Sequence, residues 1–205
     1  FIHCSNRKDR LENIKQLINK FNLDNYYILN AKYLPNNGAK GCSYSHYLAM
    51  KYSIDNNLKN CLILEDDYFI SQNTTNINSF FNNLKQNLKN KSWDVIMLWW
   101  LLNGINKRTI INTKNINNKN LLKITHKKYG ASSTLAYAVN QSMFEILKNL
   151  FYSSYQSLDD NYNHHQKHLK TDMIWRNIQH KYQWFLINPI IGEQINSKSD
   201  IHIWN

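Results

Sequence analysis

Residues 61–70, CLILEDDYFI, run from an apolar segment directly into three acids, Glu65, Asp66 and Asp67. A continuous apolar run of this length predicts a strand buried on both faces, as in a parallel sheet covered by helices. In an extended strand alternate side chains share a face, so we expect Glu65 and Asp67 to converge and Asp66 to point away. Two such carboxylates repel by about 2 to 3 kcal/mol. The pattern therefore predicts a partner that offsets the repulsion.

Strands and helices alternate along the chain on either side of this stretch. Apolar periodicity predicts strands at 1–4, 25–31, 60–70, 93–101, 121–127, 134–140 and 184–190, and helices at 10–21, 43–57, 76–90, 141–152 and 170–181. Ser43 or Ser45 is the expected N-cap of the second helix. This order predicts an α/β fold with a mainly parallel central sheet flanked by helices.

The composition sets outer limits on the fold and on the partners. A chain of 205 residues with 42% apolar residues, 2 Pro and 5 Gly predicts a single folded domain, 1–205, without linkers. The formal net charge of +11 makes an anionic partner plausible: nucleic acid, a membrane face or a phosphorylated substrate. No zinc-finger, basic-zipper or RGG pattern accompanies the charge.

The cysteines and the apolar runs bear on localisation. Cys4, Cys42 and Cys61 are odd in number and lack CxxC spacing, which predicts buried free thiols in the cytoplasm or another reducing compartment. The longest apolar run, at 95–102, is far shorter than the roughly 20 residues that span a bilayer. We therefore expect no membrane span, while a membrane-peripheral location stays open. The abundance of Asn, Lys, Ile and Tyr is typical of an AT-rich genome, such as that of a bacterium or a large virus.

A divalent cation would offset the repulsion between the paired acids. Hard Mg²⁺ or Mn²⁺ prefers carboxylate oxygen and leaves positions for the phosphate oxygens of a substrate. The acids also follow a strand, and in open α/β sheets the ligand crevice lies beyond the carboxyl ends of the strands. The alternative is a set of solvated acids, or acids paired with some of the 25 Lys and Arg residues.

Three segments carry a resemblance to a known family. IHCSNRKDR (2–10), GAKGCSYSH (38–46) and LILEDD (62–67) resemble the opening strand and turn, the Gly-x-x-Gly-Cys-x-x-Ser-His segment and the LEDD segment of glycosyltransferase family 25. This family includes bacterial lipopolysaccharide glycosyltransferases and procollagen galactosyltransferases. Weaker likenesses lie at 134–147 and at 188–201. The chain departs from the family at His3, where Asn is usual, and over 102–128, which does not align.

The resemblance implies a GT-A type, Rossmann-like fold that binds a nucleotide sugar. It implies that the acidic segment holds Mn²⁺ or Mg²⁺ on the diphosphate of a UDP-sugar. Asp67 is the first choice for a metal ligand, Glu65 ligates as well or acts through water, and His202 is a further candidate from the end of the chain. Asp66 would contact the ribose or orient the loop.

Four more residues are candidates for the nucleotide site, each with a structural alternative. Arg7 and Arg10 follow the first strand and suit phosphate or planar rings, or they are a surface Arg and an ion pair with Asp9. Ser45 and His46 border the donor site, or they are an N-cap and a packed helix residue.

An inverting transfer needs a carboxylate that takes the proton from the acceptor hydroxyl. The resemblance assigns this role to Asp172, which is otherwise an acid at a helix N-terminus. His164 and His168 have the spacing of a zinc site, but their polar neighbours favour an exposed segment.

The leading hypothesis is a glycosyltransferase that moves galactose or glucose from a UDP-sugar to a glycan or a hydroxylated protein. The alternatives are a basic nucleic-acid-binding domain and a catalytically silent relative that binds carbohydrate. Binding insensitive to a chelator favours the second hypothesis, and donor binding without turnover favours the third.

Overall fold

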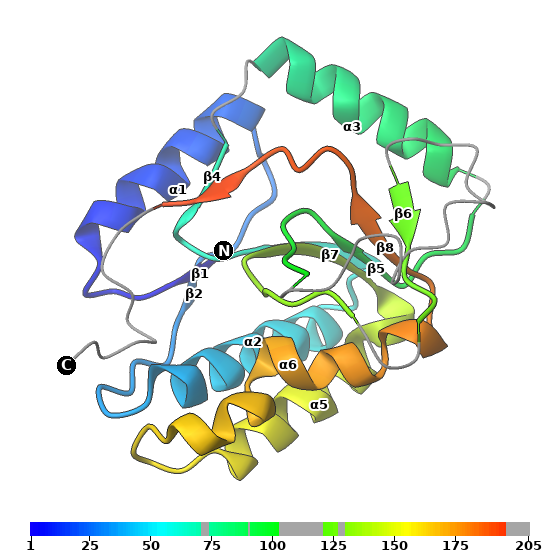
Figure 1. The fold of residues 1–205 in the computed structure, drawn as a ribbon. Helices are drawn as coiled ribbons and strands as arrows, with labels where there is room; N and C mark the ends of the chain where they lie inside the picture. Colours follow the sequence, from blue (N-terminus) through cyan, green and yellow to red (C-terminus); the bar gives the residue numbers. More distant parts are fainter. Residues whose placement is uncertain (71–73, 90, 103–120, 127–129, 196–205) are drawn as a thin grey trace.

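A computed structural model describes residues 1–70, 74–89, 91–102, 121–126 and 130–195 (Figure 1). The strands are β1 (Ile2–His3), β2 (Leu29–Asn30), β3 (Asn60–Leu64), β4 (Tyr68–Phe69), β5 (Val95–Met97), β6 (Leu121–Lys123), β7 (Ala136–Asn140), β8 (Trp184–Ile187) and β9 (Glu193–Gln194). The α-helices are α1 (Lys8–Phe21), α2 (Gly38–Asp55), α3 (Thr74–Leu88), α5 (Phe144–Ser157) and α6 (Thr171–Ile174). Short 3-10 helices lie at Gln141–Met143, His164–Leu169, Trp175–Asn177 and Gln179–Lys181.

The central sheet is mixed, so the prediction of a mainly parallel sheet was wrong in this respect. Its order is β3-β7-β5-β8-β6, and only β5 and β8 are parallel neighbours. β1 and β2 form a separate parallel pair, which a parallel bridge between Ile2 and Glu65 joins to the end of β3. The strand at 61–70 was expected to be buried on both faces, but β3 is the end strand of the five-stranded sheet and its Leu62 is 44% exposed, so this prediction was wrong for β3. The inner strands β5, β7 and β8 are largely buried, but burial does not fix strand direction.

Five of the strands nevertheless run in one direction. β3 and β5 are both antiparallel to β7, β8 is parallel to β5, and β1 and β2 are parallel to β3. Their carboxyl ends therefore lie along one edge, together with the residues that enter β7. An α/β fold with a Rossmann-like βαβαβ start, β1-α1-β2-α2-β3, places this edge beside the first half of α2.

Helices cover both faces of the sheet, as predicted (Figure 1). α1 and α3 lie on one face, where Leu17, Ile77 and Leu84 join a buried apolar cluster. α2, α5 and α6 lie on the other face, where Met50 and Phe151 belong to a second cluster. This coverage agrees with the apolar sequence of the inner strands.

The second helix begins five residues earlier than predicted, so Ser43 and Ser45 are not its N-cap. The N-cap of α2 is Asn37, whose side chain accepts a hydrogen bond from the Lys40 amide at 3.1 Å. Ser43 and Ser45 lie inside the helix and donate to the carbonyls four residues earlier. The two glycines of GAKG resemble a turn in the sequence, which explains the misplaced start.

The three acids do not continue the strand. β3 ends at Leu64, and the amide of Tyr68 donates to the carbonyl of Glu65 at 3.1 Å, which closes a turn before β4. The predicted alternation of side chains across 65–67 was therefore wrong, because it assumes an extended backbone. This turn of Glu65, Asp66 and Asp67 is called the acidic turn below.

Several other boundaries differ from the predictions. The strand expected at 25–31 is reduced to β2, and the helix expected at 170–181 is divided into α6 and two 3-10 helices. Residues 103–120, between the strands expected at 93–101 and 121–127, lie outside the described residues. Among the described residues, no helix is long and apolar enough to cross a membrane.

Candidate functional site

A pocket lies beyond the carboxyl ends of β1, β2 and β3, against the first half of α2. Its walls come from the end of β1, the start of α1, the segment after β2, α2 and the acidic turn. The lining residues are Ile2, Cys4, Arg10, Ala31, Lys32, Tyr33, Leu34, Gly38, Cys42, Ser45, His46, Glu65, Asp66, Asp67 and Gln194. The pocket therefore occupies the position where open α/β sheets bind their ligands.

Asp66 is held by the elements at the opening of the chain. Its carboxylate accepts from Nδ1 of His3 at 2.9 Å, from Nη1 of Arg10 at 2.9 Å and from the amide of Cys4 at 3.1 Å. The side chains of Asp66, His3 and Arg10 are all buried. Asn13 of α1 adds hydrogen bonds to the carbonyls of Asp66 and Tyr68. These contacts favour the loop-orienting role of Asp66 over contact with a ribose.

Glu65 faces α2 and is ionised by its neighbours. Its Oε1 accepts from Nε2 of His46 at 3.2 Å and from the hydroxyl of Thr134 at 2.7 Å. Burial alone would raise the pKa of Glu65, but the hydrogen bonds of His46 and Thr134 bring this pKa below its usual value. Because an ionised carboxylate only accepts, Nε2 of His46 donates to Glu65, and Nδ1 of the same ring lies 2.7 Å from the Tyr137 hydroxyl.

Asp67 is the acid of the turn that has a carboxylate oxygen without a hydrogen-bond donor among the described residues. Its Oδ2 accepts from Nε2 of Gln194 at 3.0 Å and lies 3.4 Å from Nη1 of Arg10. Its Oδ1 is buried and accepts no hydrogen bond from any residue that the structure describes. Burial, reinforced by the charge of Glu65, raises the pKa of Asp67 to about 6. An anionic oxygen without a donor suits a cation.

These two acids are the residues of the site that could hold a divalent cation. Glu65 and Asp67 supply hard carboxylate oxygens on one pocket, and the unpartnered Oδ1 of Asp67 is a specific reason to expect a ligand there. Carboxylate oxygens are the donors that Mn²⁺ and Mg²⁺ prefer, and a cation held by Glu65 and Asp67 stays a prediction from the sequence. His202 lies outside the described residues.

Asp172 approaches the same group of side chains from α6. The side chains of Ser43, on α2, and Thr171 lie 2.6 Å apart, which fixes the start of α6 against α2. Burial raises the pKa of Asp172, although the backbone N–H of Ser133 opposes the shift, and the charge of Glu65 adds to it. Ser133 has a φ of 89°, a conformation that non-glycine residues seldom adopt. Such strain is typical of functional loops.

Ser45 and Gly41 shape the wall of the pocket opposite the acids. The Ser45 hydroxyl accepts from the Lys32 amide at 2.8 Å. A Cβ on Gly41 would lie 2.3 Å from the Lys32 carbonyl oxygen, so only glycine permits this approach of α2 to residues 32–34. Ser45 thus has a structural role and a place on the pocket at the same time.

The pocket lining does not include Asp172, nor does it include Arg7 or the histidines His164 and His168. Arg7 forms a two-pronged ion pair with Asp9, with distances of 3.0 and 2.8 Å, so the ion-pair alternative fits Arg7. His164 and His168 are exposed on a 3-10 helix rather than on one face of an α-helix. Arg10, in contrast, lines the pocket, although its guanidinium is paired with Asp66.

Several residues of the site were missed by sequence reasoning, including Lys32 and Tyr33 of the pocket wall. Thr134 reaches the site from just before β7, Tyr137 from β7 itself and Gln194 from β9. No local sequence pattern indicates that these segments meet the acidic turn. Cys42 was assigned to the core as a buried thiol, whereas it is half-buried and lines the pocket. Its spacing from His46, one turn of the same helix, is the signal that could have identified it.

The model of glycosyltransferase family 25, described as an LPS biosynthesis protein, matches residues 5–162, well over half of the chain. The matched segment contains α2, the acidic turn and β7, and it ends before Asp172. A comparison with curated proteins gave no match.

Proposed function

The chain belongs to glycosyltransferase family 25, and from this premise we propose that it transfers a hexose, galactose or glucose, from a UDP-sugar to a hydroxyl group of a glycan or protein, with inversion and with Mn²⁺ or Mg²⁺. The family supports a glycosyltransferase with a sugar donor and a glycan acceptor. The donor, the metal and the stereochemistry are our proposal.

One observation carries the proposal: the buried, unpartnered Oδ1 of Asp67 at the edge of the pocket. In our proposal Asp67 and Glu65 hold the cation, which when bound would neutralise the negative charge of the diphosphate leaving group. His46 and Thr134 keep Glu65 ionised and fixed in direction. Arg10, His3 and the Cys4 amide hold the turn itself in place through Asp66.

The pocket wall formed by residues 31–34 is the proposed nucleotide side. It carries Lys32 and the exposed Tyr33, a cation and a planar ring that suit phosphate and a nucleobase. Gly41 and Ser45 hold its backbone, so the wall is formed before a ligand arrives. Preformed walls reduce the entropy that a ligand must lose on binding.

Asp172 is the proposed base that accepts the proton of the acceptor hydroxyl. Its raised pKa brings a carboxyl closer to the range that suits proton transfer near neutral pH. Its neighbours include Glu65, whose negative charge favours the protonated form of Asp172. An acceptor placed between Asp172 and the acidic turn would have its hydroxyl near the base and the donor together.

The test is release of UDP from UDP-galactose and UDP-glucose, measured with Mn²⁺, with Mg²⁺ and with a chelator. We expect turnover of one donor with metal, little with the chelator, and an inverted anomer in the transferred sugar. Asp55→Asn, an exposed acid on α2, is the control that should retain the activity. Donor binding without any turnover, with a range of glycan acceptors, would instead support a catalytically silent relative.

A further inference from the structure

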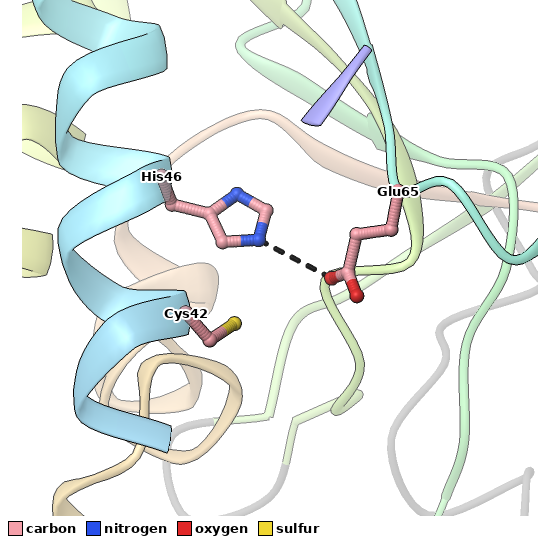
Figure 2. Close-up of side chains that lie close together, drawn as sticks. All are labelled: Cys42, His46 and Glu65. Atoms are coloured by element: carbon pink, nitrogen blue, oxygen red, sulfur yellow. Dashed lines mark hydrogen bonds and ion pairs between the residues drawn. The ribbon is translucent and has the colours of Figure 1, made fainter. Parts of the chain in front are cut away.

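Two side chains of α2 point at the acidic turn from a single face of the helix (Figure 2). Cys42 and His46 are one helical turn apart, and Glu65 lies opposite them. Their ligand atoms, the thiol sulfur, a ring nitrogen and a carboxylate oxygen, all lie within 4.8 Å of one another. Within the part of the chain that the structure describes, this is the one group of three such residues so close together.

The three donors have the chemistry of a zinc site rather than of a manganese site. Zn²⁺ is bound by cysteine sulfur, histidine nitrogen and carboxylate oxygen, commonly with three protein ligands and one open position. Mn²⁺ and Mg²⁺ instead prefer oxygen donors. The three side chains also line the pocket, which gives an ion a path to them.

The surrounding residues hold the donors as the outer shell of a metal site does. The Tyr137 hydroxyl lies 2.7 Å from Nδ1 of His46, which fixes the ring and aims Nε2 at Glu65. The Thr134 hydroxyl donates to Glu65 at 2.7 Å. Hydrogen bonds of this kind orient metal-ligating histidines and carboxylates in many proteins.

We propose that Cys42, His46 and Glu65 form a binding site for Zn²⁺ or another thiophilic divalent cation, which shares Glu65 with the Mn²⁺ or Mg²⁺ site proposed above. Glu65 would be a ligand of both cations, so Zn²⁺ bound at its carboxylate competes with Mn²⁺ or Mg²⁺ for this ligand. Zinc therefore inhibits the glycosyltransferase by displacing the catalytic cation. The predicted inhibition rests on the proposed function. The predicted zinc binding does not depend on it.

Binding of Zn²⁺ requires a deprotonated Cys42 and a free ring nitrogen on His46. Zn²⁺ binding releases the thiol proton of Cys42 to solvent, because the thiolate is the ligand. With Nε2 of His46 as the ligand atom, the ring proton is carried by Nδ1, which donates a hydrogen bond to the Tyr137 oxygen, since a phenol can donate or accept a hydrogen bond. Burial, reinforced by the charges of nearby Glu65 and Asp172, raises the pKa of the Cys42 thiol well above its usual value in the absence of a cation. A bound cation reverses that electrostatic effect.

Cobalt titration of the full chain tests the proposal, because Co²⁺ takes zinc sites and its thiolate ligands give a charge-transfer band in the near ultraviolet. We expect the band to saturate at one equivalent and to be displaced by Zn²⁺. Cys42→Ser should abolish it, while Cys61→Ser and Cys4→Ser should retain it. Cys4 is the stricter control, since it lines the same pocket. Absence of the band in the wild type, its persistence in Cys42→Ser, or its loss in Cys4→Ser would overturn the proposal.

Two further readouts separate the site from general effects on the fold. Tyr137→Phe should weaken Zn²⁺ binding by about tenfold, as is typical for residues that hydrogen-bond a metal-ligating histidine. If Cys42→Ser does not fold, Cys42→Ala replaces it and should likewise lose the cobalt band. Zn²⁺ should inhibit UDP release by the wild type and much less by Cys42→Ser. If the wild type binds cobalt through Cys42 but never binds UDP with Mn²⁺, the proposed function fails and the zinc site stands.

Discussion

Nη1 of Arg10 lies 2.9 Å from Oδ1 of Asp66, and both side chains are more than nine-tenths buried. This ion pair links α1 to the acidic turn, and the same guanidinium nitrogen lies 3.4 Å from Asp67. A buried pair of this kind contributes little net stability compared with an apolar pair, but removal of one partner leaves an uncompensated buried charge. The pair therefore makes the geometry of the turn depend on the first helix.

Arg10→Met should lower the free energy of unfolding by about 3 to 5 kcal/mol, because Asp66 would remain buried without its cation. Urea denaturation at neutral pH measures the loss. Arg7→Met is the matched control, because Arg7 pairs with Asp9, whose side chain is 61% exposed, and its effect should be much smaller. Equal losses in the two variants would contradict a special role for the buried pair.

The free energy of unfolding should depend on pH through the titration of Asp67. Its pKa is about 6 in the folded protein, against 3.8 ordinarily, so the folded state holds this proton more tightly than the unfolded chain does. The stability it contributes is complete below about pH 4 and is lost as the pH rises through 6, a difference of the order of 3 kcal/mol. In metal-free buffer, Asp67→Asn should remove this decline, whereas Asp55→Asn should keep it. An unchanged decline in Asp67→Asn would show that another group is responsible.

Gly41→Ala should weaken nucleotide binding and also lower the free energy of unfolding, because the clash is with backbone rather than with a flexible side chain. The added methyl group would lie 2.3 Å from the Lys32 carbonyl oxygen and push residues 32–34 away from α2. A displacement of this kind in a binding wall is expected to cost about tenfold or more in KM for the donor. Ser53→Ala, on the far half of the same helix, should leave KM unchanged. A Gly41→Ala enzyme with the wild-type KM would mean that this wall does not contact the donor.

Asp172→Asn should lower kcat by about 10² to 10⁴, the usual contribution of a positioned base, with little change in donor affinity. In the wild type, kcat should rise with pH through the raised pKa of Asp172, because the base acts in its deprotonated form. The measurement is a pH profile of transfer to a fixed acceptor. If Asp172→Asn keeps the same profile and rate, another group takes the proton.

Much of the site was predictable because the three motif segments converge on one pocket. Residues 2–10, 38–46 and 62–67 supply most of its lining, from the ends of β1 and β3 and from the helix that follows β2. Parallel strands joined by helices bring these segments to one edge of the sheet. This arrangement follows from the order of strands and helices along the chain. The α/β class followed from the same alternation of strands and helices.

The remaining features depend on contacts between distant segments. Nothing in the residues of β7 specifies that it enters antiparallel between β3 and β5, or that Thr134 reaches Glu65. The turn at 65–68 replaced the expected extended strand because its carboxylates and carbonyls find partners on α1 and β1. Asn37 replaced Ser43 as N-cap, because the glycine that resembles a turn is needed inside the helix.

In our proposal Asp67 holds a cation that binds the diphosphate of the nucleotide sugar. Calorimetric titration of UDP into the wild-type protein, with Mn²⁺ and with a chelator, tests it most directly when repeated on Asp67→Asn and Asp55→Asn. We predict UDP binding that requires Mn²⁺ in the wild type and in Asp55→Asn and is lost in Asp67→Asn. UDP affinity that is the same with the chelator, or undiminished in Asp67→Asn, would contradict the account.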